Sequence, residues 1–127
     1  MTTIKFPNKN AYSGNRPYAD VVLSPGVGGS ATHKCLVDTG ADYLQLPASA
    51  AAPAGISLSG ASTAKVTTVA GTVNLQRVNG VLVEIEGYRV TVDVLFDSTN
   101  AASPIAGRQL LLKAFDIGFN ATDWLWT

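Results

Sequence analysis

Apolar and polar residues alternate along several short segments of the chain, and this two-residue period is typical of β-strands. The alternation is clearest at residues 81–86 and 88–96, which flank Gly87 and therefore indicate a β-hairpin. Apolar and β-branched segments at Tyr18–Leu23 and Thr32–Val37 are separated by a loop rich in glycine and serine. These segments predict short strands joined by turns.

A helical period is seen at only one place, residues 109–115, where leucines recur at helical spacing. Residues 47–52 begin with proline and continue with alanines, which favours one or two helical turns, ended by Pro53 and Gly55. The other expected elements are strands at 65–70 and 72–78 around Gly71, a loop at 97–103, and strands at 116–119 and 123–126. We therefore expect an all-β, mainly antiparallel protein with one C-terminal helix.

Composition narrows the class of protein. A chain of 127 residues is expected to form a single domain over residues 1–127, and its 46% hydrophobic content argues against disorder. Nine basic residues balance nine acidic ones, so no surplus of positive charge is available for nucleic acid. Near-zero net charge on an apolar chain also favours self-association.

The few reactive residue types exclude several other classes. One cysteine, Cys35, and one histidine, His33, can form neither a disulfide framework nor a zinc site, so no metal or cofactor is expected. No signal segment or bilayer-length apolar run is visible, which predicts a cytoplasmic protein without membrane contact. A mature secreted chain would show the same pattern.

The segment most suggestive of chemistry follows the strand at Thr32–Val37. Asp38 comes directly after this apolar strand and is followed by Thr39 and Gly40. Gly40 permits a tight backbone reversal, and Thr39 can form local hydrogen bonds that stiffen the loop. The segment therefore predicts a carboxylate presented at a rigid turn.

Residues 36–42 (Leu-Val-Asp-Thr-Gly-Ala-Asp) resemble the catalytic loop of the retropepsin-like aspartic proteases. Residues 81–95 resemble the hairpin that follows the flap in that family, and residues 104–111 resemble its second signature of apolar residues followed by Gly-Arg. The resemblance covers roughly residues 18–127 and leaves residues 1–17 outside it. It implies a retropepsin-like barrel with one lobe per chain.

The resemblance implies a homodimeric endopeptidase acting on peptide or protein substrates. Such chemistry needs two carboxylates that share a proton, but the chain has a single Asp-Thr-Gly. The second carboxylate is then Asp38 of another copy, across a two-fold axis. By the same resemblance the terminal strand at 123–126, with Trp124 and Trp126, would seal the dimer.

The resemblance also implies roles for individual residues. Thr39 would brace the two loops, Asp42 would bind the substrate backbone and pair with Arg108, and residues 69–72 would form a flap. Apolar subsites would be lined by Leu36, Ile105 and the loop around Ala102. The implied catalytic residues are Asp38, Thr39 and Gly40. The implied substrate-binding residues are Leu36, Ala41, Asp42, Val69, Ala70, Gly71, Thr72, Ile105 and Arg108.

Other interpretations remain open at this point. The flap segment has one glycine, Gly71, where retroviral flaps are glycine-rich, which favours a non-catalytic module for peptide binding or dimerisation. A monomeric ligand carrier would leave Asp38 exposed and unpaired. Trp124 and Trp126 can equally be buried within one chain, and Cys35 is better explained as a small core residue than as a nucleophile.

Overall fold

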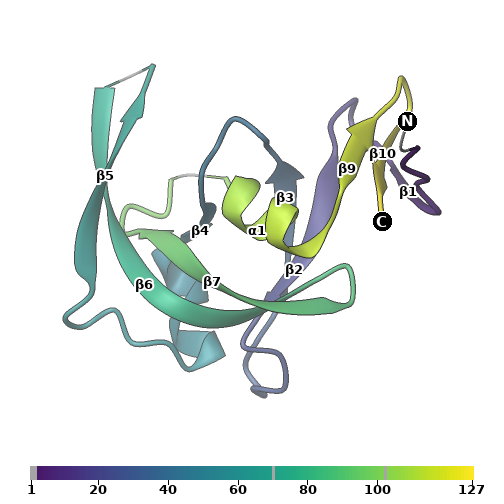
Figure 1. Ribbon diagram of the computed structural model, residues 1–127. Coiled ribbons are helices and arrows are strands. Elements are labelled where there is room, and N and C mark those ends of the chain that lie inside the picture. Colours follow the sequence, from purple (N-terminus) through teal and green to yellow (C-terminus); the bar gives the residue numbers. More distant parts are fainter. Residues whose placement is uncertain (1–2, 70, 102) are drawn as a thin grey trace.

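Most of the alternating segments form one continuous sheet (Figure 1). The computed structural model describes residues 3–69, 71–101 and 103–127. Seven strands follow the order β2-β3-β8-β4-β7-β6-β5, and a further pairing of β2 with β6 closes six of them into a ring. These strands are β2 (Tyr18–Leu23), β3 (Thr32–Val37), β4 (Leu44–Pro47), β5 (Ser62–Thr68), β6 (Gly71–Ile85), β7 (Tyr88–Asp97) and β8 (Ile105–Ala106).

The ring confirms an all-β barrel, although two of its pairings are parallel. β3 pairs with β8 and β4 pairs with β7 in parallel register, while the other ladders of this sheet are antiparallel. Apolar side chains fill its interior because each strand sends alternate residues inward. Leu44, Phe96 and Val94 are among the side chains without solvent exposure.

The predicted strands at 72–78 and 81–86 are one strand, β6, which corrects the expectation of two. A bulge between Val78 and Val81 interrupts the pairing with β7, and Gly80 there has a φ of +68°. Bulges bend a strand without ending it, so β6 runs from the barrel into the hairpin it forms with β5. The turn between β6 and β7 has positive φ at both Glu86 and Gly87, as in a type I′ hairpin.

The helical segments lie close to their predicted positions. α1 (Arg108–Ala114) packs beside β7 and has Leu110 and Leu111 fully buried. The expected turns at 47–52 are two 3-10 helices, η1 (Ala48–Ala50) and η2 (Ala52–Ala54). Pro53 lies inside η2 and does not end the segment, because proline is tolerated in the first turn of a helix. Gly55, with a φ of +73°, ends it.

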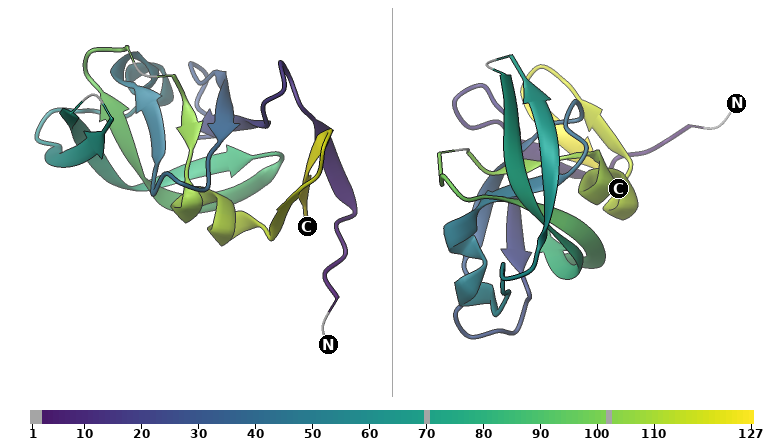
Figure 2. Two further views of the ribbon diagram at one scale, coloured as in Figure 1. Left: turned by 90° about the horizontal axis from the view of Figure 1, so that it is seen from above. Right: turned by 90° about the vertical axis from the view of Figure 1, so that its left-hand side faces the viewer.

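A second, three-stranded sheet joins the two ends of the chain. Its order is β1 (Asn8–Ala11), β10 (Asp123–Trp126) and β9 (Ile117–Phe119). It lies at one end of the molecule, and the β5–β6 hairpin lies at the other (Figure 2). Trp124 and Trp126 are 0% and 8% exposed within the single chain. The alternative of burial within one chain is therefore the one observed, and β10 has both of its edges paired.

Side-chain hydrogen bonds join the strands of this terminal sheet to one another and to the barrel. The indole N–H of Trp124 donates to the carbonyl oxygen of Tyr18 (3.0 Å), and that of Trp126 donates to Asn10 Oδ1 (3.2 Å). Asn10 Nδ2 in turn donates to the carboxylate of Glu86 at the β6–β7 turn. Within the described part of the chain, no helix is both long enough and apolar enough to cross a bilayer.

Candidate active site

Backbone hydrogen bonds hold the loop that carries Asp38 on both sides. The Asp38 N–H donates to the carbonyl oxygen of Ala106 (3.0 Å), and the Leu36 N–H donates to that of Pro104 (3.0 Å). Asp38 Oδ1 accepts the N–H of Gly40 (2.9 Å), and a Cβ at position 40 would lie only 3.1 Å from that oxygen. The carboxylate is therefore oriented by its own loop and by β8.

The start of α1 holds the far end of the same loop. The Arg108 N–H donates to the carbonyl oxygen of Ala41 (2.8 Å), and the Gln109 N–H donates to that of Asp42 (2.9 Å). The guanidinium of Arg108 also forms an ion pair with the Asp42 carboxylate. The structure thus brings Asp42 and Arg108 together within one chain, as the resemblance predicts. Both side chains are at least half exposed, at 63% and 50%.

Gly107 explains why a glycine precedes Arg108. A Cβ at this position would lie 2.4 Å from the carbonyl oxygen and 2.7 Å from the nitrogen of Tyr43. Its φ of −90° is open to any residue, so the requirement is for space and not for an unusual conformation. Any side chain at 107 would push α1 away from the segment that follows Asp42.

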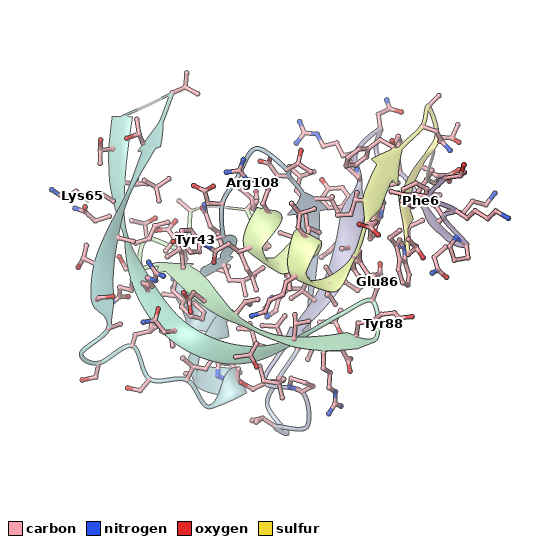
Figure 3. The ribbon with its side chains drawn as sticks, in the orientation of Figure 1. Phe6, Tyr43, Lys65, Glu86, Tyr88 and Arg108 are labelled. Carbon is pink, nitrogen blue, oxygen red and sulfur yellow. The ribbon has the colours of Figure 1, made fainter. Side chains whose placement is uncertain are left out.

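A cleft of about 740 Å³ lies between the Asp38 loop and the β5–β6 hairpin. Its floor is one row of paired residues that crosses three ladders of the sheet: Ile105 with Gln45, Gln45 with Leu95, and Leu95 with Arg77. Tyr43 lies between the hairpin and α1 (Figure 3). The cleft is lined by Asp38, Gly40, Ala41, Asp42, Tyr43, Gln45, Ala64, Lys65, Val66, Thr67, Arg77, Leu95 and Ile105.

The structure gathers some of the expected site residues and separates others. Those that line the cleft are Asp38, Gly40, Ala41, Asp42 and Ile105. Those that do not line it are Leu36, Thr39, Val69, Gly71, Thr72 and Arg108. Ala70 and Ala102 lie outside the described residues.

The expected flap residues Val69, Gly71 and Thr72 are at the far end of the hairpin, where Val69 is fully exposed. The hairpin instead borders the cleft with residues 64–67, nearer the barrel. Lys65 points away from Tyr43 on the outer side of β5 (Figure 3). The side chains that the hairpin turns inward are therefore the small apolar residues Ala64 and Val66, which alternate with it.

Sequence reasoning missed the polar residues of the cleft floor and wall. Tyr43 directly follows the motif, and Gln45 and Arg77 are far apart in sequence. Only the register of β4, β7 and β6 places Gln45 and Arg77 on either side of Leu95. No local pattern carries that information, although Tyr43 could have been suspected from its place next to Asp42.

Cys35 and His33 form no catalytic pair. The Cys35 S–H donates to the carbonyl oxygen of His33 (3.7 Å) and its side chain is fully buried. Burial, reinforced by the charge of Asp20, raises the pKa of the Cys35 thiol to about 12. A thiol of that pKa does not ionise near neutral pH, so Cys35 is a core residue. Among residues 3–69, 71–101 and 103–127, no three His, Cys, Asp or Glu side chains cluster as metal ligands.

Comparison with known families identifies the class of protein. Residues 26–112 match the sequence profile of the family described as "gag-polyprotein putative aspartyl protease", about two-thirds of the chain. The match includes Asp38, the β6–β7 hairpin and Arg108. The chain therefore belongs to this family of retropepsin-like aspartyl proteases. No curated protein matches the sequence significantly.

Proposed function

We propose that the protein is a homodimeric aspartic endopeptidase in which two copies of Asp38 activate the attacking water. The observation that carries this proposal is the position of Asp38 beside the cleft, on a loop held by β8 and by its own turn. Asp42, the other acidic residue on the cleft, is already paired with Arg108. A second copy is therefore the best source of a partner carboxylate.

A pair of Asp38 carboxylates would divide the chemistry between them. Two such groups in contact cannot both ionise cheaply, so they share one proton and titrate as a unit. The ionised carboxylate takes a proton from water as it attacks the peptide carbonyl, and the protonated one polarises that carbonyl. The carboxyl group that took the proton from water then gives it to the amine nitrogen as the C–N bond breaks, and no metal is needed for the step.

The loop that carries Asp38 has an exposed surface on which a second copy of the chain could pack. Thr39 and Gly40, at the outside of the loop, are exposed in the single chain. A two-fold axis beside them would bring each Thr39 next to its counterpart and bury both loops. In this arrangement Leu36 and Ile105 line apolar subsites, and the hairpin ends with Val69, Gly71 and Thr72 close over the peptide from both copies and exclude water.

The cleft suits a peptide in extended conformation. β5 borders it with consecutive residues, and an extended peptide can form main-chain hydrogen bonds along such a border while its side chains alternate between subsites. Asp42 would accept main-chain N–H groups of the substrate, and Arg108 would hold that carboxylate in place. We therefore place Asp42 and Arg108 in substrate binding and not in the proton transfer.

A non-catalytic module that binds peptides is the alternative, because the hairpin tip with Val69 does not border the cleft in one chain. The test is hydrolysis of a mixture of unstructured peptides between about pH 4 and 7, followed by mass spectrometry. We expect cleavage by the wild type, loss of cleavage in Asp38→Asn, and normal cleavage in Asp116→Asn, an exposed aspartate away from the cleft. Peptide binding without cleavage by the wild type would support the module instead.

A further inference from the structure

The cleft floor presents two polar side chains on either side of an apolar one. Gln45 and Arg77 are both paired with Leu95, from β4 and β6 respectively, and all three residues line the cleft. Paired residues of neighbouring strands point to the same face of a sheet. The polar ends of Gln45 and Arg77 therefore enter the same space above Leu95.

The bulge in β6 holds Arg77 in place. Its Nε donates to Asn79 Oδ1 (2.9 Å), and its Nη2 donates to Asp93 Oδ2 (2.7 Å). Asp93 Oδ1 accepts the N–H of Gly80 (3.1 Å), so a single carboxylate joins the bulge to the guanidinium. Bulges near active sites commonly aim a side chain in this way. These two bonds use two of the five N–H groups of a guanidinium.

The ring of Tyr43 lies beside the guanidinium of Arg77. The Cζ atom of Arg77 lies 5.0 Å from the centroid of the Tyr43 ring, within the range of a cation–π contact. The backbone of Tyr43 lies directly against Gly107, so the segment that carries the Tyr43 ring has little room to move. The guanidinium is thus oriented before any ligand arrives, which lowers the entropy cost of binding.

Asp93 is the carboxylate paired with Arg77. The hydrogen bond from Arg77 holds the pKa of the Asp93 carboxyl below its ordinary value, and the charge of Lys113 acts in the same direction. Lys113 donates to the carbonyl oxygen of Thr91 and does not line the cleft, so Arg77 is the cation that the cleft presents beside Leu95. The side-chain amide of Gln45 has no hydrogen-bond partner in the described part of the chain. Its NH₂ group is available as a further donor.

We propose that Arg77 and Gln45 form a subsite for the carboxylate side chain of a glutamate or aspartate in the peptide. The subsite rests on the proposed function, because it uses the same cleft. A guanidinium and an amide NH₂ together offer donors to both carboxylate oxygens. Arg77 and Gln45 are specificity-determining residues and take no part in proton transfer.

The experiment compares peptides that differ only in one residue, Glu, Gln or Leu, placed in turn at every position flanking the scissile bond. At one position we expect kcat/KM to be roughly tenfold or more higher for Glu than for Leu. Arg77→Met is expected to abolish this preference, while Arg89→Met, which removes an exposed arginine on the same sheet, should keep it. Because an ordinary glutamate has a pKa of about 4.3, the preference for Glu over Gln should fade below about pH 4.

Gln45→Glu provides a second variant that keeps the shape of the subsite. It should repel a carboxylate and lower kcat/KM for the Glu peptide with little change for the Leu peptide. Binding of the same peptides to Asp38→Asn, measured by fluorescence polarisation, separates this inference from proteolysis. Glu-selective binding that Arg77→Met removes, without cleavage by the wild type, would refute the protease and support the subsite. Cleavage without preference for an acidic residue, or no binding of any peptide, would overturn the subsite.

Discussion

Gly107 lies against the backbone of Tyr43 so closely that a Cβ at position 107 would come within 2.4 Å of the Tyr43 carbonyl oxygen. This contact joins the start of α1 to the segment that follows Asp42. It gives the Gly-Arg signature a physical reason: the glycine permits the approach, and Arg108 then reaches Asp42.

The first prediction concerns this contact. Gly107→Ala should lower the free energy of unfolding by about 1–3 kcal/mol, the usual cost of forcing extra volume into a packed site. Gly28→Ala is the matched control, because a Cβ at position 28 meets nothing within 4 Å. Urea denaturation of both variants measures the difference. Equal stability of the two variants would show that α1 and Tyr43 are not held together as described.

A second prediction concerns the pH dependence of stability. Burial raises the pKa of the Glu86 carboxyl, and the charge of Asp20 acts in the same direction. A raised pKa in the folded state means that the stability linked to Glu86 is fully present below its unfolded pKa and is lost as the pH rises through the folded value. Glu86→Gln should therefore gain stability relative to the wild type between about pH 4 and 7.

Chemical denaturation across this pH range gives the measurement. Glu84→Gln, on the same hairpin but in an exposed ion pair with Arg89, serves as the control and should follow the wild type. If Glu86→Gln instead lost stability as the pH rose, the hydrogen bond from Asn10 to the Glu86 carboxylate would outweigh its burial.

The third prediction concerns the two tryptophans. Both are buried in the single chain, and Trp126 packs against Phe115 with ring centroids 4.7 Å apart. Dilution that dissociates a dimer should therefore leave the tryptophan emission maximum unchanged. Sedimentation measures the dissociation at each dilution. An emission maximum that shifts to longer wavelength as the dimer dissociates would mean that Trp124 or Trp126 depends on a second copy for its burial.

The fourth prediction separates stability from substrate binding at Asp42. The ion pair with Arg108 is exposed, so Asp42→Asn should change the free energy of unfolding by less than about 1 kcal/mol. Its KM for peptide should rise, because the variant replaces one of the two carboxylate oxygens that accept substrate main-chain N–H groups with an NH₂ donor. Glu84→Gln breaks a comparable ion pair away from the cleft and should alter neither quantity. A large loss of stability in Asp42→Asn would assign the residue a structural role.

Local patterns sufficed for much of the fold. Strands β2 and β3, the β6–β7 hairpin and the helix α1 depend on periodicity and turn residues that neighbouring positions reveal. Strands β4 and β8 were missed because they are short and are defined by their pairing partners, not by alternation. Asn79-Gly80 has the composition of a hairpin turn, but here it forms the bulge in β6 because the pairing with β7 continues on both sides of it.

The residues of the candidate site also fall into those that a local sequence pattern reveals and those that it does not. Asp38, Gly40 and Asp42 lie together in sequence, so a motif is enough to find them. Gln45 and Arg77 meet only through the register of β4, β7 and β6. The pairing of the C-terminal strand with Asn8–Ala11 could not be predicted from the sequence either, because strand partners so distant in sequence leave no local signal.

Mixing wild-type and Asp38→Asn chains tests most directly whether each catalytic site uses two copies of Asp38. The chains are refolded together at constant total concentration, and peptide hydrolysis is measured as the wild-type fraction changes. If both carboxylates are required, activity should follow the square of that fraction and reach roughly a quarter in an equal mixture. Activity of about half or more in the equal mixture, with mixed dimers shown to be present, would mean that a dimer with one Asp38 is active and would contradict the account.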